Sequence, residues 1–146
     1  MSRSRITHRF AAGDPGERPR QFNIVIEFDE AANQYAVVPG NTVIPPGFGT
    51  GTNGGRIRWF LMPKQGDTLT FNSNGPGGGI DFANPPSFLD LTYRNGNTIA
   101  STPWVNALTS NDAAQFFDYD VYVLVNGTAV TIDPDVENPP PPPGTF

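Results

Sequence analysis

The sequence has 146 residues and a formal net charge of −5, and its length is enough for one domain with a single hydrophobic core. Glycine and proline contribute 16 residues each, an excess that excludes a helical bundle because neither residue is tolerated in helix interiors. The sequence contains no cysteine and one histidine, His8, which excludes disulfides, thiol nucleophiles, thiolate metal sites and histidine-cluster metal centres.

Charge is unevenly distributed along the chain. Residues 1–20 contain five arginines and two acidic residues, a net charge of +3, whereas the rest contains four basic and twelve acidic residues, a net charge of −8. An acidic body repels phosphates, so nucleic acid is disfavoured as a partner except through residues 1–20. No apolar run approaches the length of a membrane-spanning helix, and residues 1–20 lack the apolar centre of a secretory signal. We therefore expect no membrane partner and a cytoplasmic location.

Composition divides the chain into three segments. Residues 1–20 are predicted to form a basic extended arm, residues 21–132 a β-sandwich domain, and residues 133–146 an extended proline-rich tail. The tail includes Pro139–Pro143, and five consecutive prolines favour a polyproline II segment that cannot join a central sheet.

Alternation of apolar and polar residues predicts short strands in the middle segment. The phase of this alternation places Trp59 and Val123 in the core. A short helical turn is predicted at 101–104, because Thr102 suits the N-cap and a proline follows it. The predicted strands cover residues 22–28, 34–38, 56–62, 68–71, 88–93, 117–125 and 128–132. This pattern predicts an all-β fold, a single antiparallel Greek-key β-sandwich.

Four segments carry a resemblance to a known family. They are Gly-Gly-Arg-Ile-Arg-Trp at 54–59, Gly-Asp-Thr-Leu-Thr-Phe at 66–71, Phe-Asp-Tyr-Asp-Val-Tyr-Val at 117–123 and Asp-Pro-Asp-Val-Glu-Asn at 133–138. In this order they make the chain from about residue 22 to residue 138 resemble the cupredoxin-like β-sandwich domains of small bacterial proteins.

The resemblance implies a Greek-key sandwich but not the metal site of the family. Blue-copper members hold their metal with two histidines and one cysteine, usually with an axial methionine. Here the cysteine is missing, His8 lies upstream of the first strand, and Met62 cannot bind copper alone. We therefore expect no copper, no electron transfer and no cofactor.

Acidic residues alternate along two segments near the C-terminus. Asp118 and Asp120 lie two residues apart on a strand, about 7 Å, which suits an inverting glycosidase but is also typical of a solvated strand face. Asp133, Asp135 and Glu137 are candidate oxygen ligands for Ca²⁺, or else a solvated edge before the proline run. Because the usual general bases and nucleophile partners are missing, the sequence predicts that the protein is not an enzyme.

Glycine-rich loops and tryptophan define a ligand-binding alternative. The stretches 47–55 and 75–79 lack the Gly-Lys-Ser/Thr ending of a phosphate-binding loop and are interpreted as loops of the sandwich. Trp104 lies beside a loop and is interpreted either as part of the core or of a lid over it, or, if exposed, as a candidate to stack on a sugar ring. The alternative function is therefore a sandwich that binds a carbohydrate or another small ligand with its glycine-rich loops and Trp104.

Three features predict self-assembly. The arm is rich in arginine. The outward side of the strand at 117–125, together with Phe116 just before it, is apolar. The tail ends in an aromatic residue. The candidate interaction residues are Arg3, Arg5, Arg9, Phe116, Tyr122, Leu124 and Phe146. The sequence predicts a non-enzymatic structural or interaction module that forms homo-oligomers or binds subunits of its own family.

The partner of the arm stays open among three alternatives. It binds nucleic acid inside a shell, as the basic arms of capsid proteins do. It pairs its guanidinium groups with the acidic body of a neighbouring subunit. Or it has no fixed partner and is disordered.

Overall fold

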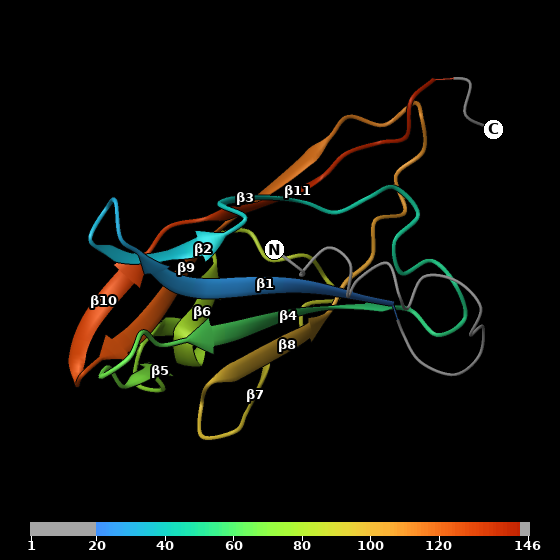
Figure 1. Ribbon diagram of the computed structural model, residues 1–146. Coiled ribbons are helices and arrows are strands. Elements are labelled where there is room, and N and C mark those ends of the chain that lie inside the picture. Colours follow the sequence, from blue (N-terminus) through green and yellow to red (C-terminus); the bar gives the residue numbers. More distant parts are fainter. Residues whose placement is uncertain (1–19, 144–146) are drawn as a thin grey trace.

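The computed structural model describes residues 20–143, where nearly all regular structure is β, so the expected all-β fold is confirmed (Figure 1). A short 3-10 helix, η1 (Pro76–Gly79), lies between two strands, and no helix in the described range is long and apolar enough to cross a bilayer. The strands in chain order are β1 (Arg20–Asp29), β2 (Gln34–Val38), β3 (Asn41–Val43), β4 (Gly55–Met62), β5 (Leu69–Phe71), β6 (Ile80–Phe82), β7 (Thr92–Arg94), β8 (Ile99–Pro103), β9 (Gln115–Val125), β10 (Thr128–Ile132) and β11 (Asp135–Asn138).

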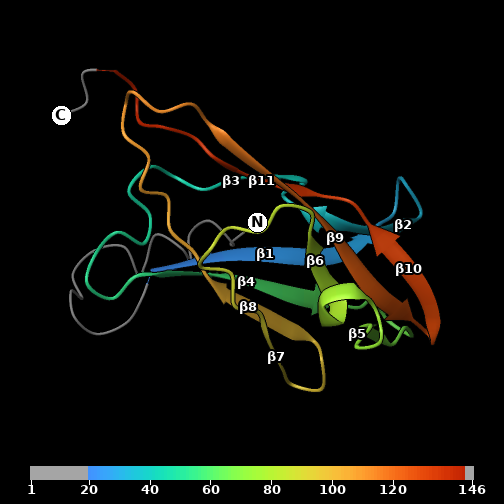
Figure 2. The same cartoon turned by 180° about the vertical axis from the view of Figure 1, so that it is seen from behind.

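The strands form two sheets that pack as a sandwich (Figures 1 and 2). One sheet has five strands in the order β2-β1-β4-β8-β7. The other has six, in which β10, β9, β11 and β3 form a path and β5 and β6 also pair with β9. Both sheets are mixed, because β1 is parallel to β4 and β3 is parallel to β11.

This mixed pairing corrects the expected purely antiparallel arrangement. After β2 the chain leaves the five-stranded sheet for β3 in the other sheet, and it returns through the loop at 44–54. It re-enters at the end of the sheet where β1 begins, so that Gly55 lies opposite Arg20 and β4 runs in the same direction as β1. Alternation of apolar and polar residues predicts which side chains of a strand face the core, but it does not predict whether the neighbouring strand is parallel or antiparallel.

β9 is the central strand of the six-stranded sheet. β10 and then β11 pair along one of its edges in one continuous register, and β5 and β6 pair along the other. β11 lies inside residues 133–146, for which the sequence predicts an extended tail, so that boundary is wrong and the sheet continues to Asn138. Val136 and Asn138 alternate into the interior, while Pro134 lies in the break between β10 and β11, where the sheet needs no N–H donor.

The segment expected to form a helical turn is also different. Residues 101–103 belong to β8, which pairs with β4, and Thr102 is fully buried. Its Oγ1 accepts a hydrogen bond from the backbone N–H of Asp90 at 2.9 Å instead of capping a helix. The strand expected at 88–93 contributes only its last two residues to β7. β3 and β6 have no counterpart among the predicted strands.

The core between the sheets is rich in aromatic side chains. Trp59 and Val123 are fully buried, as the strand phase predicts. The Trp59 Nε1–H donates to the Tyr119 hydroxyl at 3.0 Å, and the Phe82 and Tyr119 rings stack with their centroids 4.8 Å apart. The buried aromatic residues are Tyr35, Phe48, Trp59, Phe71, Phe82, Trp104 and Tyr119. Because each strand turns one face to these rings, its alternate residues point to the other side, and most of them form the two outer surfaces of the sandwich. Asn23, Val25 and Ser101 have this outward phase on the five-stranded sheet but are buried.

Candidate interaction surfaces

The outer face of the six-stranded sheet carries the three apolar residues that the sequence singles out on β9. Phe116, Tyr122 and Leu124 alternate with residues that face the core, so they point away from it. Phe116 is 65 % exposed, more than any other large hydrophobic side chain in residues 20–143, whereas Tyr122 and Leu124 are half-buried. Asp118 and Asp120 point to the same side and separate Phe116 from the other two.

Carboxylates of neighbouring strands face one another on this surface. Asp135 of β11 lies directly opposite Asp118, and Asp81 of β6 lies directly opposite Asp120. Like charges directly opposite each other on adjacent strands repel and destabilise a sheet. We call the six carboxylates on this side of the sandwich the acidic face; they are Asp81, Asp118, Asp120, Asp133, Asp135 and Glu137.

The negative charges of the acidic face affect the pKa of Tyr122. Partial burial raises the pKa of Tyr122, and the negative charges of Asp120 and Asp81 raise it further. The hydroxyl of Tyr122 donates a hydrogen bond to Asp120 Oδ2 at 3.3 Å. Ionisation of the phenol is opposed here because it would add another negative charge beside the carboxylates.

A hollow of about 390 Å³ opens at one end of the acidic face. Its lining includes Phe116 and three acidic residues, Asp118, Asp133 and Asp135. A guanidinium group suits such a place, because it forms paired hydrogen bonds with carboxylates and stacks on aromatic rings. The hollow can therefore accept an arginine side chain.

The structure does not support the calcium interpretation of Asp133, Asp135 and Glu137. Asp133 and Asp135 line the hollow, but Glu137 does not. Within residues 20–143, no three His, Cys, Asp or Glu side chains are grouped closely enough to hold a metal ion. The physical reason is the extended backbone of β11, which spaces its outward side chains along the sheet instead of wrapping them around a cation.

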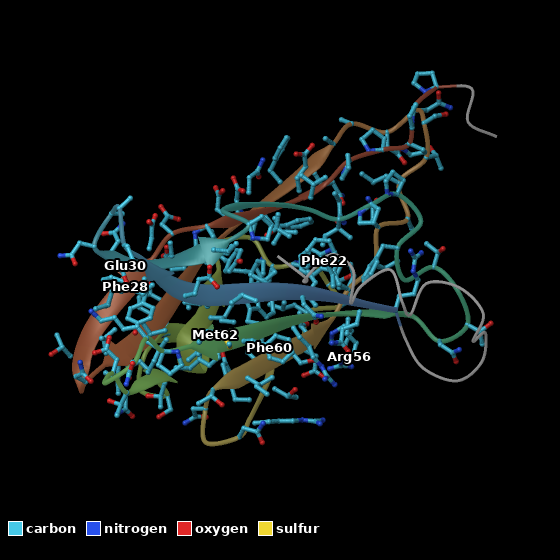
Figure 3. All side chains as sticks on the ribbon, in the orientation of Figure 1. Phe22, Phe28, Glu30, Arg56, Phe60 and Met62 are labelled. Atoms are coloured by element: carbon cyan, nitrogen blue, oxygen red, sulfur yellow. The ribbon has the colours of Figure 1, made fainter. Side chains whose placement is uncertain are left out.

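Three arginines lie on the opposite surface of the sandwich, the outer face of the five-stranded sheet. Arg56 and Arg58 alternate on β4 with fully buried residues, so they point away from the core. Arg94 lies on the edge strand β7, which β8 separates from β4. Figure 3 shows Arg56 on β4, with Phe60 and Met62 further along the same strand. We call Arg56, Arg58 and Arg94 the arginine face.

The charges of the arginine face are close together and repel one another. Burial lowers the pKa of Arg58, and the positive charges of Arg94 and Arg56 lower it further. The Arg56 Nε–H donates to Ser101 Oγ at 2.8 Å, which orients that guanidinium. The Nε of Arg58 is buried and has no hydrogen-bond partner among the described residues. This surface can therefore bind anionic groups, which would supply acceptors and reduce the repulsion.

Trp104, the candidate for sugar stacking, is only 1 % exposed. Its Nε1–H donates to Asn138 Oδ1 at 2.9 Å, and its ring packs edge-on against Phe88 and Phe117. Neither face of the ring is open to a ligand, so the interpretation of Trp104 as a sugar-stacking residue is wrong. The reason is long-range: β11 brings a polar partner for the indole into the interior.

The glycines of the loop at 47–55 have a packing role. Gly49 has a φ of +76°, and a Cβ there would overlap the carbonyl oxygen of Trp104. A Cβ on Gly55 would lie 2.9 Å from the same oxygen. The loop is therefore rich in glycine because its backbone passes very close to the chain after β8, and it is not arranged around a phosphate.

Sequence reasoning did not single out the arginine face or Asp81. The signal for Arg56 and Arg58 was present, because both alternate in the sequence with apolar residues of the predicted core face. Arg94 and Asp81 join these surfaces only through strand pairing, which no local pattern reports. The predicted interaction residues Arg3, Arg5, Arg9 and Phe146 lie outside the described residues.

Comparison with known proteins identified no relative: no family model matches the chain, and no curated protein matches it.

Proposed function

We propose that the protein is a non-enzymatic structural or interaction module that associates with further copies of itself. The outer face of β9 supplies the contact, with Phe116 as the main apolar residue and Tyr122 and Leu124 further along the strand. The observation that carries the proposal is the 65 % exposure of Phe116 beside the hollow of the acidic face. Burying a phenylalanine side chain contributes about 1.5–3 kcal/mol, so its exposure favours a partner that covers it.

The two ends of the chain take part in this proposal. Residues 1–20 carry a net charge of +3, opposite in sign to the acidic face of a neighbouring copy. Ion pairs between arginine and carboxylate set orientation and specificity more than affinity. Phe146 provides a second aromatic group for docking on a neighbour.

The non-enzymatic part of the proposal rests on the available chemistry. The sequence has one histidine, His8, and no cysteine, and Asp118 and Asp120 stand on an open strand face. We also propose, from the sequence resemblance, that the sandwich has cupredoxin-like Greek-key connectivity without a copper site. The packing of two sheets over one core supports that part.

The self-association proposal is tested by measuring the mass of the full-length protein over a range of concentrations by sedimentation velocity. We expect oligomers for the wild type and a clear loss of association for Phe116→Ser. Leu108→Ser, which removes an apolar side chain from the loop between β8 and β9 and not from the outer face of β9, is the control and should associate like the wild type. A wild type that stays monomeric at its highest soluble concentration would overturn the proposal.

One cavity favours the small-ligand alternative. It has a volume of about 240 Å³ and lies beside the glycine-rich loop, with a mainly apolar lining that includes Pro46, Gly47, Leu108 and Pro141. Ligand sites usually have volumes of about 300–1,000 Å³, so only a very small group fits. Ligand-observed NMR with a panel of monosaccharides tests this alternative. Binding that Leu108→Trp abolishes would support it, and a panel without any binder would eliminate a monosaccharide as the ligand.

A further inference from the structure

We propose that copies of this protein stack in series, with the arginine face of one molecule docked on the acidic face of the next. The inference rests on the proposed self-association and names the second surface that takes part. Phe116 and the carboxylates around it receive Arg56, Arg58 and Arg94 of a second copy. Each molecule thus offers two different contact surfaces, one on each side of the sandwich.

The first argument is the concentration of negative charge on the acidic face. Two cross-strand pairs, Asp118 with Asp135 and Asp81 with Asp120, place like charges directly opposite each other. Such pairs destabilise the isolated sheet. A cationic surface laid over them would turn this repulsion into attraction, so the arrangement favours association with positive charge.

The second argument is the matching repulsion on the arginine face. Arg58 is acted on by the positive charges of Arg94 and Arg56, and its buried Nε lacks a hydrogen-bond partner among the described residues. The buried Nε is itself shielded from a docked molecule, but Arg56 and Arg58 are half-buried and Arg94 is exposed, so their other N–H donors can bind an acceptor from outside this cluster. Carboxylates are the acceptors with the best charge and geometry for that task.

The third argument is the position of the two surfaces. The arginine face belongs to the five-stranded sheet and the acidic face to the six-stranded sheet, on opposite sides of the sandwich (Figures 1 and 2). A molecule can therefore use both surfaces at the same time. The contact is heterologous, because different patches meet, and a heterologous contact continues from copy to copy unless its rotation closes a ring.

Shape and chemistry at the hollow fit the same occupant. The hollow places an aromatic ring, Phe116, beside Asp118, Asp133 and Asp135. An incoming arginine would stack on the ring and share its N–H groups with the carboxylates. The exposed apolar ring and the exposed carboxylates are thus covered in one step.

Two full-length double variants test the stacking. Arg58→Gln with Arg94→Gln weakens the arginine face and leaves the bond from Arg56 to Ser101 in place, while Asp118→Asn with Asp120→Asn weakens the acidic face. We expect each variant alone to show at least a roughly tenfold higher Kd for self-association. Each variant retains one intact surface that complements the other's. An equimolar mixture should therefore form one-to-one dimers that do not grow further.

The control variant is Glu30→Gln with Asp90→Asn. It raises the net charge by two, as Asp118→Asn with Asp120→Asn does, but on loops outside both faces, and it should associate like the wild type. Thermal unfolding followed by circular dichroism verifies that every variant is folded. Raising sodium chloride from about 0.05 M to about 0.5 M should weaken wild-type association, because these surface charges are screened.

The outcomes separate this inference from the function on which it rests. A monomeric wild type overturns both the proposed self-association and the stacking. An oligomeric wild type that Phe116→Ser dissociates, but Arg58→Gln with Arg94→Gln does not, keeps self-association and refutes the stacking. Absence of dimers in the equimolar mixture also refutes it. If inorganic phosphate binds the arginine face but the variants associate normally, the surface is an anion site and the stacking is wrong.

Discussion

The hydrogen bond from Trp59 to Tyr119 lies in the middle of the core, where both side chains are almost completely shielded from water. Removing the phenol oxygen leaves a buried indole N–H without its acceptor, and such a loss costs about 1–3 kcal/mol. We therefore expect Tyr119→Phe to lower the free energy of unfolding by that amount in urea titrations. Tyr122→Phe, on the outer surface, should change it by less than about 0.5 kcal/mol. Equal urea midpoints for the two variants would contradict this role.

The same phenol makes stability depend on alkaline pH. Burial raises the pKa of Tyr119 in the folded state well above its ordinary value of 10.0. Above pH 10 the unfolded chain releases this proton while the folded chain keeps it, so stability decreases as the pH rises. Urea midpoints measured between about pH 9 and about pH 12 should fall for the wild type. The urea midpoint of Tyr119→Phe should fall less steeply with pH. A slope equal to that of the wild type would show that Tyr119 is not the group responsible.

At the scale of secondary-structure elements, the side chain of Asn138 connects the end of β11 to the residues that follow β8. Asn138 accepts from Trp104 Nε1 at 2.9 Å and donates to the carbonyl of Val105 at 3.0 Å. Asn138→Ala would leave both groups without a partner, so we expect a loss of about 1–3 kcal/mol in the free energy of unfolding. Glu137→Ala, on the outward side of the same strand, is the control and should stay within about 0.5 kcal/mol of the wild type.

The sequence predicts the three longest strands, β1, β4 and β9, and also the short β5, but it does not predict β8 or β11. β2 and β10 match their predicted ranges at both ends, and β9 begins two residues earlier than predicted. β3 and β6 are also not predicted, and they pair with β11 and β9. β8 contains Thr102-Pro103, a dipeptide that favours a helix start, but its pairing with β4 outweighs that local preference.

The candidate surfaces were predictable to the extent that one strand determines them. The phase of β9 places Phe116, Tyr122 and Leu124 outward without knowledge of any other strand. The hydrogen-bond partner of the buried Trp104 was not predictable, because Asn138 lies 34 residues away in sequence. The grouping of Arg94 with the arginines of β4 depends in the same way on the pairing of β8 with both neighbours.

At the scale of the whole molecule, the arm contributes charge to the proposed assembly. Deleting residues 1–19 retains Arg20, whose N–H donates to the carbonyl of Gly54 at 3.1 Å, and so keeps β1 intact. The deletion removes four arginines and two acidic residues. We expect it to lower the oligomer order measured by light scattering and to leave the β-rich circular dichroism spectrum unchanged. An unchanged oligomer order would show that the arm takes no part in the assembly.

Within residues 20–143, the arginine face and the acidic face lie on opposite sides of the sandwich, and together they contribute a dipole component that runs across its sheets. Its direction is set by the arginine face at the positive pole and the acidic face at the negative pole. In dilute solution at low ionic strength, the molecule therefore has a preferred orientation next to any charged surface. It presents its arginines to an anionic support and its carboxylates to a cationic one, so the support selects which side of the sandwich stays accessible to other molecules.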